Sequence, residues 1–384
     1  MEPRLYIDVH ILQTVPPANL NRDDHGNPKE AYFGGVRRSR VSSQAWKRAT
    51  RKRFAEHLPE QDLATRTKKI AAKLTERLQQ RCGLDEDQAS RIAAALLAPL
   101  GISAGKKAGD TAYLFFYGRR QLEDVVDLIA DRATELAALP DTDLEAQIKD
   151  LPVQEKFSTG HPLDVALFGR MVADIPSLNV DAATQVAHAL STHATELEFD
   201  YYTAVDDENT REETGAGMIG NIGFNSATLY RYATVGLHQL MDNLSDAAAA
   251  VDAADLFVES FARSIPTGYE NSFAHRTLPS FVAVVLRADQ PVNLVSAFET
   301  PITTTTAGIA TASAQRLARE HTAAIRMWGD TPLYTAQCHS FDADRDDTAT
   351  AAVLKEAFGE PLTFTDLRNG LRAQLTTALQ QERA

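Results

Sequence analysis

The chain has 384 residues, of which 44% are hydrophobic and 24% charged. This length and composition are those of a large folded domain or of two domains, and they exclude extensive disorder. The formal net charge of −13 argues against a general attraction to nucleic acid, and no apolar run reaches the about 20 residues that a membrane-spanning helix needs. The first residues also lack a signal-peptide pattern, so we expect a cytoplasmic protein without a membrane partner.

The first predicted element is a half-buried strand over residues 5–12, where apolar side chains alternate with mostly polar ones: Leu5, Ile7, Val9 and Ile11. Residues 13–35 are rich in Pro, Gly, Asn and Asp, and this composition predicts a long loop. Loops of such length within a compact domain are usually functional.

A basic segment follows at residues 37–53, where no acidic residue occurs among eight Lys and Arg residues. Ser42 or Ser43 can cap a helix that begins here, because a serine hydroxyl accepts a free backbone N–H. Helical spacing puts a polar stripe on one side, formed by Gln44, Lys47, Arg48 and Arg51, and turns Trp46, Ala49 and Thr50 toward the core. Such a stripe can confine an anion to one surface, and the alternative is an ordinary solvated helix face.

Residues 60 to about 150 show helical spacing, with Ile70, Leu74 and Leu78 four residues apart, and predict a helical insertion. A further helix is predicted over Val180 to Ala194, with Asp181 as a possible N-cap. The continuous apolar run at 281–286 predicts a buried strand, and residues 366–382 predict a closing helix.

Residues 197–205 alternate in the manner of a strand, and an acidic, Gly-containing stretch separates them from a second strand-like segment at 218–232. This arrangement predicts a long hairpin arm. Five apolar or aromatic residues can act there, or nearby, as wedges between bases, while ordinary packing is the alternative: Met171, Tyr201, Tyr202, Met218 and Ile219.

Asp23 and Asp24 form the best candidate carboxylate pair and could hold Mg²⁺ for phosphodiester cleavage. The alternative is local, since these side chains can cap loop amides or orient Arg22. No third carboxylate is placed beside them by the sequence, and Cys82 and Cys338 are too far apart in sequence to predict a zinc site. We therefore expect no catalytic residues, no metal and no cofactor.

Several runs carry a resemblance to a known family: Asn21-Arg22-Asp23-Asp24, Phe33-Gly34-Gly35, Arg38, Arg40, Ser42-Ser43-Gln44, Lys47-Arg48-Ala49, Gly169-Arg170-Met171, Ala187-His188-Ala189, Thr203-Ala204-Val205-Asp206-Asp207, Tyr230-Arg231-Tyr232-Ala233 and Ala297-Phe298-Glu299. In this order they resemble the CasC family, the backbone subunit of the type I-E CRISPR surveillance complex Cascade. Relatives often carry a lysine after the Ala-Phe-Glu segment, where this sequence has Thr300 and Pro301.

The resemblance implies an α+β fold with an RRM-like (ferredoxin-like) palm. Residues 1–59 would be its first part, with an RNA-binding loop and helix, 60–160 a helical fingers insertion, and 161–384 the rest of the palm with a β-hairpin thumb at about 195–232. It also implies that copies of the chain stack head to tail along CRISPR guide RNA, contact other Cascade subunits and meet target DNA through the guide. The family type implied does not cut nucleic acid, so we expect no enzyme.

The basic residues and the resemblance together predict an RNA-backbone interface formed by Arg22, Lys29, Arg38, Arg40, Ser42, Ser43, Gln44, Lys47, Arg48, Arg51 and Arg170. Phosphate contacts supply affinity without reading sequence, which suits a guide carrier. Two other hypotheses compete with this one. The chain could be a metal-dependent RNA endonuclease that uses Asp23 or Asp24, as in type III-like backbone subunits, or an RNA chaperone that binds without stacking.

Overall fold

The computed structural model describes residues 4–102, 110–112, 114–172, 175–204, 218–303, 308–341 and 348–382. The chain divides into two compact units, the first comprising residues 1–53, 185–236 and 254–384 and the second residues 54–184 and 237–253. The second unit thus starts before the expected insertion and ends after it, and it takes in residues 237–253, which were expected in the palm. In the described ranges no helix is long and apolar enough to cross a membrane.

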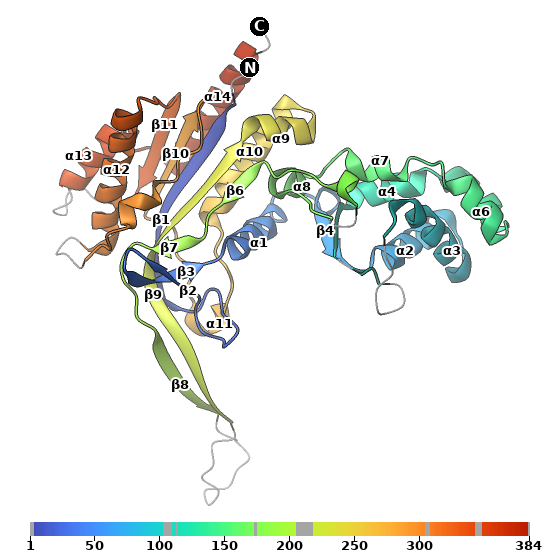
Figure 1. The fold of residues 1–384 in the computed structure, drawn as a ribbon, viewed down its shortest axis with the longest axis horizontal. Coiled ribbons are helices and arrows are strands. Elements are labelled where there is room, and N and C mark those ends of the chain that lie inside the picture. Colours follow the sequence, from blue (N-terminus) through green and yellow to red (C-terminus); the bar gives the residue numbers. More distant parts are fainter. Residues whose placement is uncertain are drawn as a thin grey trace, which may run out of the picture. The chain divides into compact units, whose positions relative to one another are not determined.

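A large sheet forms the base of the first unit (Figure 1). Its strands are β1 (Tyr6–Ala18), β2 (Glu30–Phe33), β3 (Val36–Val41), β6 (Thr184–Val186), β7 (Ala189–Ser191), β8 (Glu198–Ala204), β9 (Met218–Gly236), β10 (Phe281–Arg287) and β11 (Tyr334–His339). They lie in the order β11-β10-β1-β9-β7-β3-β2, while β6 and β8 also pair with β9. The central strand β1 is antiparallel to both β10 and β9. With its helices, this sheet makes the fold α+β.

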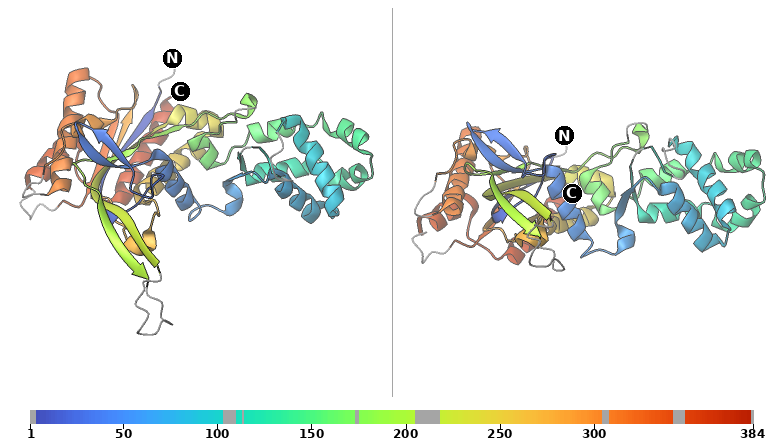
Figure 2. Two further views of the ribbon diagram at one scale, coloured as in Figure 1. Left: turned by 60° about the horizontal axis from the view of Figure 1, so that its bottom comes forward. Right: turned by 90° about the horizontal axis from the view of Figure 1, so that it is seen from below.

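Helices lie on both sides of the centre of this sheet (Figure 2). They are α1 (Ser43–Phe54), α10 (Ala247–Arg263), which starts in the second unit, α11 (Glu270–Phe273), the short 3-10 helix η5 (Leu294–Phe298), α12 (Ile309–Trp328), α13 (Thr348–Phe358) and α14 (Phe364–Glu382). On one face of the sheet, Leu12 of β1 shares a core with α12 and α13. On the other face, Arg231 of β9, which lies opposite Ile11 of β1, contacts Trp46 of α1 and Phe261 of α10. Because both faces are covered, β1 is buried from Ile7 to Gln13, and the prediction of a half-buried strand is wrong.

The predicted loop 13–35 is shorter than expected, because β1 continues to Ala18 and β2 begins at Glu30. The register between β1 and β9 shifts between Val15 and Ala18, where Pro16 and Pro17 stand. Proline has no N–H to donate to a neighbouring strand, so an irregularity at this point is expected.

The helix predicted over Val180 to Ala194 is wrong. The segment instead contains the short strands β6 and β7, and β7 pairs with β9 and β3 through Leu190, which lies opposite Tyr230 and Arg40. Other predictions are confirmed: β10 is buried along its whole length, α14 closes the described chain, and α1 begins at Ser43.

The second unit is mainly helical, as predicted for residues 60–150 (Figure 1). Its helices are α2 (Ile70–Cys82), α3 (Glu86–Leu97), α4 (Arg119–Asp127), α5 (Ala133–Ala137), α6 (Asp141–Ile148), α7 (Val153–Ser158), α8 (Leu163–Phe168) and α9 (Leu237–Leu244), with short 3-10 turns at Glu60–Asp62, Ala98–Leu100, Ala130–Arg132 and Pro176–Leu178. The predicted spacing of Ile70, Leu74 and Leu78 is confirmed, because all three are fully buried in one core. The sequence did not anticipate a two-stranded sheet of β4 (Ala64–Thr67) and β5 (Phe115–Gly118).

The predicted hairpin arm is confirmed as a pair of strands. β8 and the first part of β9 are antiparallel, with Glu198 opposite Phe224 and Ala204 opposite Met218. The acidic turn, Asp206 to Gly217, lies outside the described residues, and so do the side chains of Met218 and Ile219.

Candidate nucleic-acid interface

The basic helix α1 is fixed to the first unit by its apolar face. Trp46 is fully buried beneath the Arg231 guanidinium, which lies 3.8 Å from the indole ring centre, and meets Phe261 edge to face. The Thr50 hydroxyl is 3.3 Å from that of Ser264. On the opposite side Gln44 and Arg48 are exposed, and Lys47 and Arg51 are partly exposed. The predicted separation of the two helix faces is confirmed.

The start of α1 is capped by Ser42, as predicted. Its hydroxyl accepts the Ala45 N–H at 3.3 Å, while its own N–H donates to the side-chain oxygen of Asn21 at 2.9 Å. Ser42 and Ser43 are both buried. The Ser42 side chain therefore serves the helix start, and Gln44 is the first polar residue of α1 that is exposed.

Two of the predicted RNA-binding arginines face the interior. The fully buried Arg38 guanidinium donates to the carbonyls of Phe33, Ser191 and Phe298 at 2.8–3.1 Å, and its burial lowers the guanidinium pKa. In the second unit, the Arg170 guanidinium donates to the carbonyls of Leu178, Phe116 and Phe157, and burial lowers its pKa to about 10. The guanidinium donors of both residues thus bind backbone carbonyls of the protein itself, and neither side chain is exposed for the predicted contact with RNA.

An open recess, called the polar recess below, lies beside the loop between β1 and β2 and is lined by Asp23, Asp24, Asn27, Pro28, Lys29, Glu30, Arg37, Arg40 and Leu197. Arg37 pairs with Glu30 at 2.7 Å. Arg40 donates to the Glu30 carbonyl at 3.0 Å and lies 3.0 Å from Nδ1 of His188. The pKa of His188 is lowered, first by its burial and then by the charges of Arg40 and Lys29, and all three effects disfavour a positive charge on this ring.

The loop that carries Asp23 is held by its own polar groups. Oδ1 of Asp23 accepts the N–H groups of His25 and Asn27, both at 2.9 Å, which is the capping role predicted as the alternative to metal binding. Arg22 lies over the Tyr269 ring, 4.9 Å from its centre. Throughout the described part of the chain, no three His, Cys, Asp or Glu side chains gather as possible metal ligands.

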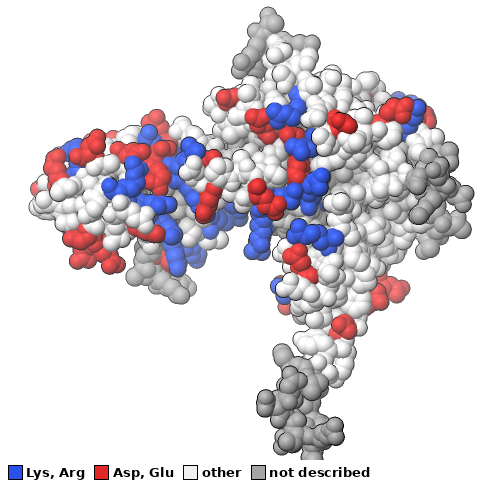
Figure 3. All heavy atoms as spheres, turned by 180° about the vertical axis from the view of Figure 1, so that it is seen from behind, with Lys and Arg blue, Asp and Glu red and all other residues white. Residues whose placement is uncertain are grey.

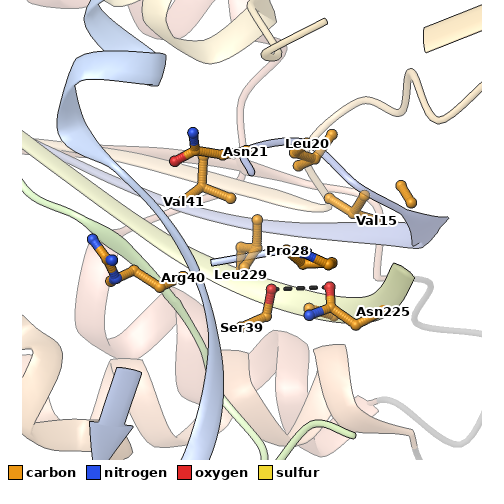
Figure 4. A pocket seen from close by; sticks show the side chains of 11 residues that line it. Val15, Leu20, Asn21, Pro28, Ser39, Arg40, Val41, Asn225 and Leu229 are labelled. Atoms are coloured by element: carbon orange, nitrogen blue, oxygen red, sulfur yellow. Dashed lines mark hydrogen bonds between the residues drawn. The ribbon is translucent and has the colours of Figure 1, made fainter. Parts of the chain in front are cut away.

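Beneath this loop, a small apolar pocket separates the end of β1 from β3 (Figure 4). Val15, Leu20, Val41 and Leu229 contribute to its wall, and a hydrogen bond of 3.1 Å from Ser39 to Asn225 closes one side. The Arg40 guanidinium points away from this bond (Figure 4). The apolar side chains of this pocket therefore support the loop between β1 and β2, while the Arg40 guanidinium stays at the surface.

The arm carries exposed aromatic side chains. Tyr201 is 66% and Tyr202 38% exposed, but the two project to opposite faces because neighbouring residues of a strand alternate. Phe199, which is 57% exposed, shares the face of Tyr201. Met171, 84% exposed, belongs to the second unit, so it is not grouped with these side chains. The alternation of residues 197–205 already indicated that Leu197, Phe199 and Tyr201 share a face, although only Tyr201 was selected as a site residue.

Charged side chains of both signs lie on the second unit. Figure 3 shows basic and acidic side chains intermixed over the helical part of the surface in view. Arg77 and Arg81 pair with Glu123 at 2.9 and 3.3 Å, and Arg81 also pairs with Asp127 at 2.6 Å. The exposed face of α1 is distinct in that its own helix offers no carboxylate.

The fold is shared with chains of CRISPR RNA-guided surveillance complexes. One, from a structure titled "CRISPR RNA-guided surveillance complex, pre-nicking", is 31% identical with a TM-score of 0.83, over 96% of this chain and 100% of that one. Another, titled "CRISPR RNA-guided surveillance complex", is 27% identical with a TM-score of 0.72, over 96% and 99%. Residues 7–367 match the family described as CT1975-like protein, and the chain belongs to that family. A comparison with curated proteins found no match.

Proposed function

We propose that this protein is the guide-RNA-binding backbone subunit of a type I-E Cascade complex. Several copies stack head to tail along the CRISPR RNA in the cytoplasm, beside other Cascade subunits. They hold the phosphate backbone without reading sequence and leave the spacer bases free to pair with target DNA in antiviral defence. The titles of the two similar structures and the membership in the CT1975-like family support this proposal.

The observation that carries the proposal is the cationic face of α1. Trp46 and Thr50 fix the opposite face of the helix in the core, so Lys47, Arg48 and Arg51 are presented from a rigid element. Cations on a rigid element suit phosphate groups, because the backbone that carries them needs no further ordering on binding. Lys29 and Arg40 extend the proposed interface into the polar recess, and Gln44 can bond a phosphate or a 2′-OH. Arg38, Arg170, Ser42 and Ser43 are left out of it.

We further propose that the first unit is an RRM-like palm, that the helical insertion forms fingers and that β8 and β9 form the thumb. A β10-β1-β9 core between helices supports the palm. The arm exposes Phe199 and Tyr201, and two strands alone are marginally stable in water. A surface outside the chain, such as RNA and the next copy, would supply the missing contacts.

We propose that the protein is not an enzyme. Asp23 already accepts two loop amides, and the described residues offer no set of metal ligands. These observations support scaffolding over the competing reading of a type III-like endonuclease subunit.

The proposal is tested by the salt dependence of guide binding. Replacing Lys47, Arg48 and Arg51 together by Ala should reduce the slope of log Kd against log salt by roughly 2, since each single-strand phosphate contact contributes about 0.7. A control variant replaces three cations elsewhere by Ala: Arg132, Arg326 and Lys355. Of these, Arg132 pairs with Glu135 at 3.2 Å. An equal loss of slope in both variants would show a general charge effect and contradict the assigned interface.

A further inference from the structure

The short helix α11 lies beside the base of the arm and is flanked by two strained residues (Figure 1). Tyr269, directly before it, has φ of +49°, and Ala274, directly after it, has φ of +45°. Residues other than glycine rarely adopt this left-handed backbone, and those that do gather at functional sites. Nε2 of the buried His275 lies 3.0 Å from the Pro266 carbonyl oxygen, a contact that joins the two ends of the segment. Glycine or asparagine would adopt the backbone of position 269 at lower cost, so a tyrosine here indicates a use for its ring.

The Tyr269 ring begins a row of aromatic contacts that leads to the arm. Phe273 meets it edge to face, with 6.3 Å between the ring centres. The Phe273 ring centre in turn lies 5.8 Å from that of Phe224 in β9, which stands opposite Glu198 at the base of the arm. Aromatic pairs favour edge-to-face and offset geometries, so this row of contacts from β9 sets the position of the Tyr269 ring.

On its other side, the Tyr269 ring meets the loop between β1 and β2. The guanidinium carbon of Arg22 lies over the ring, 4.9 Å from its centre. The loop backbone is fixed at this point, because Arg22 pairs with Pro28 and the Lys29 N–H donates to the Asn21 carbonyl at 2.9 Å. The ring therefore acts on a side chain whose backbone already has a defined place.

The two segments also touch through their backbones. A Cβ on Gly268, next to Tyr269, would lie 2.5 Å from the carbonyl oxygens of Asn19 and Leu20. The Arg22 side chain remains exposed. A cation held over a ring makes no hydrogen bond in that contact, so the N–H donors of the guanidinium stay available for phosphate. The ring thus limits where the Arg22 charge lies without neutralising it.

We propose that Tyr269 is a positioning residue that holds the Arg22 guanidinium in place for a phosphate of bound single-stranded RNA. Arg22 directly precedes Asp23, which lines the polar recess with Lys29 and Arg40, so this phosphate would neighbour those held in the recess. A side chain that is already in place binds more tightly, because its ordering cost is not incurred on association. This inference rests on the proposed function and gives an aromatic segment a part in it that the pattern of cations does not indicate.

A double-mutant cycle in the full chain tests whether the ring acts through the cation. Binding of a fluorescein-labelled oligouridine of about eight nucleotides is measured by anisotropy over a range of salt concentrations. Arg22→Ala should weaken binding about fivefold and reduce the salt slope by about 0.7, the contribution of one phosphate contact. Tyr269→Ala should weaken binding about threefold, both in the unsubstituted chain and in Arg40→Ala. In Arg22→Ala the same substitution should cost less than about 1.5-fold, because no guanidinium is left to position.

Two other substitutions of Tyr269 separate the ring from the backbone. Tyr269→Phe keeps the ring and should retain affinity, because a cation–π contact does not need the hydroxyl. Tyr269→Gly removes the ring and relieves the left-handed backbone, so it should bind RNA as weakly as Tyr269→Ala while melting at no lower a temperature. An equal loss of binding in these two variants would therefore be due to the missing ring and not to strain or misfolding.

Each opposing outcome overturns the inference. An equal loss from Tyr269→Ala with and without Arg22 would show that the ring does not act through the guanidinium. Recovered affinity in Tyr269→Gly would assign the effect to the backbone, and lost affinity in Tyr269→Phe would assign it to the hydroxyl. Unchanged binding in Arg22→Ala would remove the phosphate contact itself. If the unsubstituted chain binds no RNA, the proposed function fails, which is a different result from all of these.

Discussion

The ring of Tyr202 covers Gly220 on the neighbouring strand of the arm, and a Cβ on Gly220 would lie 2.3 Å from the ring carbon Cζ. The two residues are directly opposite in the β8–β9 register. The Tyr202 ring therefore fills the space that a side chain at position 220 would take. This contact limits the orientation of the ring in a two-stranded arm, where few other contacts are available.

Two glycine substitutions should differ in their effects. Gly220→Ala meets only the far end of the Tyr202 ring, which can turn away, so the free energy of unfolding should fall by less than about 1 kcal/mol. Gly34 has φ of +60°, and a Cβ there would meet the Glu299 carbonyl oxygen at 1.6 Å. Gly34→Ala should therefore lower the free energy of unfolding by about 3 kcal/mol. Equal urea midpoints for the two variants would contradict this difference.

Replacing Arg38 should destabilise the fold. Arg38→Met leaves the carbonyls of Ser191 and Phe298 without their donor in the interior, and we expect a loss of about 3 kcal/mol. Arg38→Lys should recover part of it, because an ammonium lacks the planar donor set. The control is Arg37→Met, whose exposed pair with Glu30 should contribute less than about 1 kcal/mol. Denaturant unfolding measures all three, and comparable losses at 37 and 38 would refute the buried role.

Stability should fall below about pH 6.5 because of two buried histidines. Burial lowers the pKa of His321 to about 4 and that of His10 well below its usual value. The charge of Arg287 lowers the pKa of both rings, and the charge of His321 also lowers that of His10. The unfolded chain thus binds protons first as the pH falls. Stability is full above pH 6.5 and is lost between pH 6.5 and the folded pKa, by about 3 kcal/mol for His321 alone.

The measurement compares unfolding in urea at pH 7 and pH 5 for the unsubstituted chain and His321→Phe. The variant should lose about 2 kcal/mol less between these two pH values. Asp8 faces the same cluster through Arg287 and Tyr232, and burial raises its pKa, which acts in the opposite direction in both proteins. The difference between the proteins therefore isolates the ring of His321, and an identical pH dependence would show that it does not titrate in this range.

Labelled guide RNA and its target should stay intact during long incubation with Mg²⁺ or Mn²⁺. Asp23 is occupied by the amides of His25 and Asn27, and a cleavage site needs a set of ligands that holds the metal. Gel analysis of labelled RNA checks this, with chelator and with Asp24→Ala as controls. Cleavage that requires the metal and disappears in Asp24→Ala would establish the endonuclease reading instead.

Local sequence patterns were sufficient to predict secondary structure and buried faces where tertiary contacts did not alter them. The spacing within 43–54 predicted both faces of α1, and the apolar run at 281–286 predicted a strand buried on both sides. The alternation of 197–205 predicted β8 and, read further, the shared face of Leu197, Phe199 and Tyr201. These features repeat over a few residues, so the helical or extended backbone geometry determines them directly.

Pairing across the chain decided the rest. Leu190 became part of a strand because Arg40 and Tyr230 lie beside it. The centre of the sheet was buried on both faces because α12 packs on one of them, while Trp46 of α1 packs against Arg231 of β9 on the other. The largest difference between prediction and structure concerns the basic segment. Arg38 and Arg48 both belong to it and were both predicted to bind RNA, yet Arg38 is buried and Arg48 is exposed. Composition alone determined that this segment is cationic. Only the tertiary structure decided which cations face outward, because a guanidinium is buried where distant backbone carbonyls converge to accept its hydrogen bonds.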